Sequence, residues 1–405
     1  MSKQQVLLHQ MHINRAPTGW KVKTVGESCL IRNDLRRPIS IEEREKIKGE
    51  YPYYGPTGIL YYINEYLVEG RFALIGEDGD HFLKYNSKHQ TLLVEGKFNV
   101  NNHAHLIEAT KECSVDWFYH YFRHRNITAF LTRQGAGRYK LNKETLKRIP
   151  ILLPPLSEQK AITDILSTWD RAIEKIERLI VDKEKQFNWL QHQLIINSTL
   201  NNITWQHCRI CDIADRIQRK SNGIEYPILT ISSAAGFVLQ EEKYSRFMAG
   251  KSVEDYILLR RGEFAYNKGN SQRFQFGCIF KLNDYDEALV PHVYVCFKLH
   301  DEIDPVYLGH VFESDYLKHQ LGALVKTGVR NNGLLNIRPE EFMSVTVPIP
   351  PAQQQEFIAG TLNTARQEID LLKSQAQAYR KQKRGLMQKL LTGLWRVKTD
   401  LENVV

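Results

Sequence analysis

The chain has 405 residues but lacks any long hydrophobic run. No window approaches about 18 consecutive uncharged apolar residues, so we expect no membrane-spanning helix. The apolar part of residues 1–17 is too short and too polar for a signal peptide, and we interpret this stretch as the tail of a cytoplasmic protein. The phosphate-binding pattern GxxxxGK followed by Ser or Thr is also missing, so we expect no nucleotide hydrolysis by this chain.

Cysteine is scarce, with six residues in the whole chain. Only Cys208 and Cys211 form a CxxC pair, which His207 precedes. A structural zinc site needs a second pair of ligands at similar spacing, and the sequence offers none. We therefore expect no metal site and interpret the pair as two small buried thiols. We interpret His103 and His105 as residues on the polar face of a strand.

The composition that remains is that of a globular, mildly basic protein. Hydrophobic residues make up 42% of the chain and charged residues 25%, which is typical of a folded chain. Its length exceeds one comfortable hydrophobic core, so two or more domains are expected. The 55 basic residues outnumber the 46 acidic ones, and the net charge of +9 mildly favours a polyanionic partner.

One short pattern occurs twice. ILLPPLSEQ occupies residues 151–159 and VPIPPAQQQ residues 347–355, so that Pro154 corresponds to Pro350 with a shift of 196 residues. Each copy opens a heptad pattern of apolar residues at alternating steps of four and three, which is typical of a helix that packs along another helix. We expect two long helices, at about 157–198 and 353–394. The predicted pairing residues are Ile162, Leu166, Trp169, Ile173, Ile176, Ile180, Ile358, Leu362, Ala365, Ile369, Leu372 and Ala376.

The repeat extends upstream of both junctions. Trp20 and Trp205 open similar segments, and a glycine-containing loop lies before each junction, in residues 132–151 and 326–349. The segments between these landmarks differ and consist of short β-type runs with loops. We therefore predict an α+β fold with an internal pseudo-two-fold repeat, in which two globular domains with twisted β-sheets are separated by two long antiparallel coiled-coil helices. The expected order is tail 1–17, domain 18–155, helix 156–200, domain 201–351, helix 352–396 and tail 397–405.

The chain resembles the specificity subunits of type I restriction-modification systems. The resemblance lies in the two tryptophans, the junction IPILLPPLSEQKAI, its second copy VPIPPAQQQEFIAG and the ending YRKQKRGLMQKLLTG. These stretches follow the order of the family and cover nearly the whole chain. One departure is Gln354, which stands where the family usually has an acidic residue and should alter a local contact but not the fold.

The resemblance implies a function and partners. The two globular domains would be target recognition domains, each of which reads one half of a split site in double-stranded DNA. The helices would act as a ruler and would dock two modification subunits, which bind S-adenosylmethionine and methylate adenine. Two restriction subunits would add ATP- and Mg-dependent translocation and cleavage. This chain would hold no cofactor and do no chemistry itself, in agreement with the absence of an Asn-Pro-Pro-aromatic stretch for a flipped adenine.

Arginine, lysine, asparagine and glutamine are the residues that read base edges in the major groove. The candidate base readers of the first domain are Arg32, Asn33, Arg36, Arg37, Tyr53, Tyr54 and Lys84. Those of the second are Gln218, Arg219, Lys220, Asn222, Lys268, Asn270, Gln272 and Arg273. Because the two interiors differ, the two half-sites should differ too. Solvated surface loops remain the alternative interpretation for every one of these residues.

Basic residues beside glycines are candidates for phosphate contacts, because glycine lets a backbone approach closely. They are Arg133, Arg138, Lys140, Lys326 and Arg330. Two other classes of protein remain open from the residues alone. A scaffold, with a coiled-coil spacer between two protein-binding domains, would show no salt-dependent affinity for DNA. A fused nuclease or methyltransferase would act on DNA without partners.

Overall fold

The computed structural model describes residues 5, 6, 9, 15–134, 138–201, 205–243, 250–325 and 335–398. The chain divides into two compact units, and each is described by itself below. The first comprises Met1–Glu177 and Ser374–Val405, and the second comprises Arg178–Lys373. Each unit therefore contains a globular part and a portion of both long helices. None of the described helices is long and apolar enough to cross a membrane.

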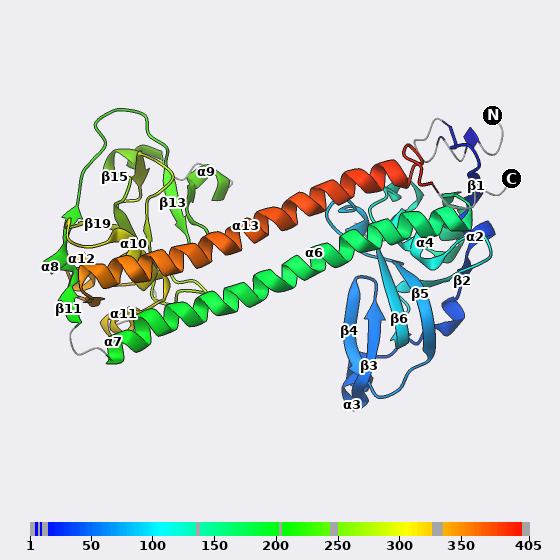
Figure 1. Ribbon diagram of the computed structural model, residues 1–405, viewed down its shortest axis with the longest axis horizontal. Coiled ribbons are helices and arrows are strands. Elements are labelled where there is room, and N and C mark those ends of the chain that lie inside the picture. Colours follow the sequence, from blue (N-terminus) through cyan, green and yellow to red (C-terminus); the bar gives the residue numbers. More distant parts are fainter. Residues whose placement is uncertain are drawn as a thin grey trace. The chain divides into compact units, whose positions relative to one another are not determined.

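The first unit is built on a six-stranded sheet with the order β2-β7-β5-β6-β3-β4 (Figure 1). Its neighbours run antiparallel except β3 and β6, which pair in parallel. The strands of this sheet are β2 (Leu30–Ile31), β3 (Lys48–Gly55), β4 (Gly58–Ile63), β5 (Val68–Gly76), β6 (Thr91–Val100) and β7 (Ala104–Glu108). Two further pairs are β1 (Lys21–Thr24) with β10 (Pro150–Leu153), and β8 (Thr132–Gln134) with β9 (Arg138–Lys140). The short helices are α2 (Val25–Ser28), η1 (Asn33–Leu35), α3 (Ile41–Lys46), η2 (Asp80–Phe82), α4 (Val115–Phe122), η3 (Thr128–Phe130) and α5 (Lys143–Arg148).

The core of the first unit centres on Trp117 of α4, which is fully buried. Its ring meets the edge of Trp20 at a centroid distance of 5.5 Å. Its indole nitrogen donates to the carbonyl of Leu152 on β10 over 2.8 Å, which satisfies the polar group inside the core. Ser114 caps α4 by accepting from the backbone N–H of Trp117. The packing thus joins the start of the globular part to the strand that leads into the first long helix.

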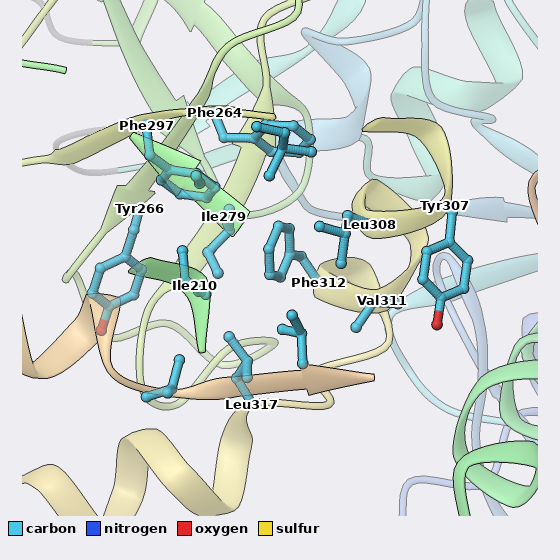
Figure 2. Packing of buried hydrophobic residues seen from close by; sticks show 14 of the residues in the cluster. Ile210, Phe264, Tyr266, Ile279, Phe297, Tyr307, Leu308, Val311, Phe312 and Leu317 are labelled. Atoms are coloured by element: carbon cyan, nitrogen blue, oxygen red, sulfur yellow. The ribbon is translucent and has the colours of Figure 1, made fainter. Parts of the chain in front are cut away.

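The second unit holds a different sheet, of four strands in the order β12-β19-β16-β17, and three two-stranded pairs, β11-β20, β13-β14 and β15-β18. The strands are β11 (Gln206–Arg209), β12 (Ala214–Ile217), β13 (Leu229–Ser232), β14 (Gly236–Leu239), β15 (Ile257–Arg260), β16 (Phe264–Asn267), β17 (Cys278–Lys281), β18 (Glu287–Val290), β19 (Val295–Leu299) and β20 (Thr346–Ile349). The short helices are α8 (Ile210–Ile213), α9 (Gln240–Lys243), η5 (Gly250–Asp255), α10 (Pro305–Glu313), α11 (Lys318–Leu324) and α12 (Pro339–Met343). Figure 2 shows its core, in which Phe264 stacks on Phe297 and both meet Phe312 of α10 edge-on.

The two long helices are α6 (Leu156–Gln191) and α13 (Ala352–Leu390). The first continues through one π-helical stretch, η4 (His192–Asn197), into α7 (Ser198–Asn201). The second ends near Gly393, whose φ of +71° is a conformation that favours glycine. In each unit the two helices run antiparallel. In the first unit Asp170 pairs with Lys383 and Glu177 with Arg380, and in the second Glu184 pairs with Lys373 while Arg366 lies over the ring of Phe187. The predicted fold class is therefore confirmed.

The predicted pairing residues lie on the facing sides of these helices. Ile162, Leu166, Ile173, Ile358, Leu362, Ile369 and Ala376 are buried, and Trp169, Ile176, Ile180, Ala365 and Leu372 are half-buried. Two expectations about residues outside the long helices were wrong. Cys208 is half-buried and Cys211 exposed, because they lie on an edge strand and a one-turn helix. His105 is buried within β7 and not on a polar face.

Candidate nucleic-acid interface

The repeated junction makes the same contacts in both units. In the first, the indole nitrogen of Trp20 donates to Oε2 of Glu158 over 3.0 Å. In the second, the indole nitrogen of Trp205 donates to Oε1 of Gln354 over 2.8 Å. Glu158 and Gln354 are equivalent in the repeat, and both can accept this bond, because a carboxylate and an amide each offer an oxygen. The departure from the family pattern at Gln354 thus preserves the bond but removes a charge.

The next residue of each junction positions a helix of the globular part. The side-chain amide of Gln159 accepts from the backbone N–H of Ser114 and donates to the carbonyl of Pro154. Gln355 accepts from the backbone N–H of Asp304 and donates to the carbonyl of Pro350. Ser114 and Asp304 are the N-cap residues of α4 and α10. Each glutamine therefore holds the corresponding helix of the globular part against its own long helix. This contact occurs in both copies of the Pro-Pro pattern.

A third contact repeats with its charges exchanged. Each globular part has a buried histidine, His120 or His310, that is followed three residues later by a charged residue. These charged residues are Arg123, directly after α4, and Glu313, at the end of α10, and they occupy equivalent places. Arg123 binds Asp170 of α6 through both carboxylate oxygens, at 2.7 and 2.8 Å. Glu313 binds Arg366 of α13 at 2.6 Å. Asp170 and Arg366 are also equivalent in the repeat. We call each contact between a globular part and its long helix a joint; the globular part contributes the positive charge in the first joint and the negative charge in the second.

Two candidate DNA-contacting residues of the first unit, Arg36 and Lys140, contact Glu77, the residue directly after β5. Arg36 lies 2.6 Å and Lys140 3.3 Å from its carboxylate. Arg36 also donates to the carbonyl of Asn102. Residues that are far apart in sequence, and were predicted separately as base reader and phosphate contact, therefore share one carboxylate. Glu77 neutralises part of their charge and fixes the positions of both side chains.

The buried ring of His105 contacts residues beside this cluster. It is fully buried, and burial lowers its pKa, so the ring stays neutral. Nε2 lies 2.7 Å from the carbonyl of Leu141 and Nδ1 lies 2.9 Å from the amide nitrogen of Asn33. These contacts are consistent with a tautomer in which Nε2 donates to Leu141 and Nδ1 accepts from Asn33. The ring of His105 thus links the side chain of Asn33 to Leu141, the residue directly after β9.

The other candidates of the first unit lie in several places. Arg32 binds Asp34 and Glu108, and Arg37 binds Glu65. The ring of Tyr53 is only 1% exposed, and its hydroxyl bridges two backbone groups, so it is a core residue in this structure. Tyr54 packs edge-on against Phe98 and Lys84 is exposed. Arg133 lies over the ring of Tyr139, while Arg138 lies on β9.

The second unit reproduces the backbone of the Glu77 cluster. The N–H of Leu141 donates to the carbonyl of Glu77 over 2.7 Å, and the N–H of Leu335 donates to the carbonyl of Lys268 over 3.1 Å. In each copy this bond joins the residue that follows a core strand, Glu77 or Lys268, to a residue in the segment before the junction, Leu141 or Leu335. Lys268 also donates to the carbonyl of Ile337. The predicted phosphate-contact residues Lys326 and Arg330 lie outside the described residues.

The remaining candidates of the second unit form two separate groups. Arg219 binds the buried Glu263 and Lys220 binds Asp255, both close to β12 and β15. Arg273 lies 3.4 Å from Glu313, so the loop after β16 reaches the joint of the second unit. Exposed polar side chains complete these groups: Gln218, Asn222, Asn270 and Gln272.

Sequence reasoning missed the residues that organise these surfaces. Glu77, Gln159 and Gln355 carry the key contacts, and the shift of the repeat would have pointed to the two glutamines. Nothing in the pattern around Glu77 distinguishes it from a solvated loop residue. Across the described ranges, no group of three or more His, Cys, Asp or Glu side chains is placed to hold a metal ion.

Comparison with known proteins shows what the chain is similar to. The family model described as the type I restriction modification DNA specificity domain matches residues 17–183. A protein of Haemophilus influenzae named as a type I restriction enzyme specificity subunit is 27% identical over 84% of this chain and 86% of its own length. The MjaVIII specificity subunit of Methanocaldococcus jannaschii is 24% identical over 96% of both chains.

The chain is similar to type I restriction-modification specificity subunits, and its residues 17–183 match their DNA specificity domain. Its fold is shared by the crystal structure of the S subunit from M. genitalium, with a TM-score of 0.60, 14% sequence identity and coverage of 93% of this chain and 96% of the other. Both curated relatives above carry the name of specificity subunit. In this chain, the repeated junctions described above are the parts that the two halves share, and the sheets are the parts that differ.

Proposed function

We propose that this chain is a specificity subunit that reads an asymmetric, two-part DNA site, with one globular domain on each half. The observation that carries this proposal is that one set of joints occurs twice and supports two different sheets. Corresponding joints favour equivalent presentation of the two domains, while different sheets and loops favour different base sequences. A chain built to bind one repeated target would have no use for two unlike interiors.

The long helices are proposed to set the distance between the half-sites. At about 1.5 Å per residue, a helix of some 40 residues spans roughly 60 Å, or at most some 17 base pairs at 3.4 Å each. Contacts that reach inward would lie roughly one helical turn apart. The same helices are proposed to dock two modification subunits that methylate adenine with S-adenosylmethionine. Two restriction subunits would then supply ATP- and Mg-dependent cleavage of unmodified DNA.

The proposed DNA surface of the first domain is the cluster around Glu77. Arg36 and Lys140 are positioned there by one carboxylate, and Asn33 by His105. In the second domain, the corresponding surface is the loop that begins at Lys268, together with Arg219 and Lys220. We assign base reading to the side chains predicted above other than the buried Tyr53, and phosphate contacts to Lys140 and Arg133, because the paired strands β8 and β9 carry both.

The experiment is to co-express this chain with the modification subunit encoded beside it in a host without DNA methylation. Methylated adenines are then mapped by long-read sequencing. The expected result is one two-part motif with a fixed spacer and two unlike halves. A stable complex that methylates nothing would contradict the proposal and would favour a scaffold. Methylation by this chain alone would show an enzyme.

A further inference from the structure

The outer edge of the helix pair carries charges in heptad rows. Asp170, Glu177 and Glu184 follow one another at intervals of seven residues on α6. At the equivalent positions of the repeat, α13 carries Arg366, Lys373 and Arg380. All six come directly after a seam position, which is Lys183 in the case of Glu184 and an apolar or aromatic residue for the other five, so they flank the contact between the helices. We call these sets the acidic row and the basic row.

The two rows meet across the helix pair. In the first unit, Arg380 forms an ion pair with Glu177. In the second unit, Lys373 lies 2.7 Å from Glu184. The outermost members face the globular domains, where Asp170 binds Arg123 and Arg366 binds Glu313. Every member of both rows therefore has an opposite charge as its partner.

Pairing between two like helices would bring like charges together. In the same antiparallel register, the residue that faces Glu177 would be Glu184 of a second α6, because Glu184 is the repeat equivalent of Arg380. Two copies of α13 would oppose Lys373 and Arg380. Lys383, which is buried and paired with Asp170, would face Arg366 in the same arrangement. Charges at such flanking positions are a known determinant of partner choice in coiled coils.

We propose that the acidic and basic rows select the partner of each long helix, so that α6 pairs with α13 and not with its own kind in a second copy of this chain. The two helices share the heptad spacing of their seam, which by itself would permit either pairing, although α13 has Ala365 and Ala376 where α6 has Trp169 and Ile180. The rows remove this ambiguity. The proposal concerns assembly of the chain and does not depend on DNA reading.

Charge reversal on full-length protein tests the proposal. The basic variant is Glu177→Lys/Glu184→Lys, the acidic variant is Lys373→Glu/Arg380→Glu, and the exchanged variant combines all four. The control is Asp164→Lys/Asp182→Lys, which changes the charge of α6 equally at exposed positions that pair only within their own helix. We expect the basic and acidic variants to melt about 3 to 6 °C below wild type, and the exchanged variant and control within about 1 °C of it.

Partner choice is tested by co-expressing the tagged basic variant with the untagged acidic variant. Each repels itself within the chain, but any helix of one complements any helix of the other. The expected result is recovery of the two in near-equal amounts, whereas a tagged and an untagged wild type purify apart. The proposal fails if the exchanged variant melts as low as its parents, or if the co-expressed variants purify separately. The second failure would mean that the rows stabilise the helix pair without selecting it.

Discussion

Arg396 lies 2.6 Å from Oε1 of Glu158, a carboxylate whose side chain is only 5% exposed. The other oxygen of the same carboxylate accepts the bond from Trp20. A residue near the end of the chain thus completes the joint at which the first globular domain meets its helix. The equivalent joint in the second unit uses Gln354, which binds Trp205 without a charge.

Replacing Glu158 by Gln should keep the bond to Trp20 and lose the ion pair with Arg396. Because Glu158 is buried, we expect the free energy of unfolding to fall by about 1–2 kcal/mol. Denaturant titration measures the loss. Combined with Arg396→Met, the substitution should cost little more than Arg396→Met alone. Additive losses would show that the two side chains do not act together.

The buried histidine of α4 predicts a loss of stability in acid. Burial lowers the pKa of His120 to about 3, against a value of about 6.5 in an unfolded chain. Between these values the unfolded chain binds the proton and the folded chain does not, so stability is present above pH 6.5 and is lost as the pH falls. From pH 7 to pH 5, the free energy of unfolding should fall about 2 kcal/mol further in wild type than in His120→Gln.

Glutamine is the matched replacement because its amide can retain the bond of His120 to the hydroxyl of Ser167, which is 3.2 Å from Nε2. The two proteins share all other titrating groups, so only the difference between their pH profiles is attributed to His120. Parallel profiles would contradict a neutral, buried ring at this position.

Lys383 predicts a gain of stability in base. Burial lowers its pKa to about 8, assisted by Arg123 and opposed by the bond to Asp170. Between pH 8 and 10.5 the unfolded chain holds more protons than the folded one, so the contribution of this residue to stability rises with pH. Relative to Lys383→Met, wild type should gain about 1–2 kcal/mol between pH 8 and pH 9.5 in denaturant melts. A difference that is constant with pH would overturn this assignment.

The Glu77 cluster predicts a salt effect at Lys140. If Lys140 contacts a phosphate, then Lys140→Ala in the complex with modification subunits should weaken all DNA alike. The slope of log affinity against log salt should shrink by about 1. Titrations at several salt concentrations, with matching and unrelated duplexes, measure both effects. Lys147→Ala, which removes a cation paired with Glu144 on α5, is the control, and a changed sequence preference would contradict a phosphate role.

The sequence was most informative where it repeats itself. The two Pro-Pro junctions predicted two long helices and a domain before each, because an apolar pattern in heptads reports helix packing independently of what the helices carry. The bounds were less predictable. The π-helical stretch at His192–Asn197 depends on packing of the helix end against the second unit's core, through Ile195, which no local pattern reveals.

The site was less predictable than the fold. Basic residues in loops were predicted as a class, but their partners come from distant parts of the chain, as Glu77 does for Arg36 and Lys140. Tyr53 shows the opposite difficulty, since a tyrosine in a polar, glycine-rich run is a plausible surface residue until the strand pairing buries its ring. Which side of a strand faces the core depends on register, and the register of β3 shifts twice along its pairing with β4.

The opposite polarity of Arg123–Asp170 and Glu313–Arg366 has a consequence for any engineered exchange of the two domains. A first domain moved into the second position with a crossover at the prolines would bring Arg123 against Arg366. A crossover that also carries the helix as far as the residue equivalent to Asp170 would keep its ion pair. The smallest segment that can be exchanged with its ion pair intact is therefore longer than the globular domain, and it ends inside the helix.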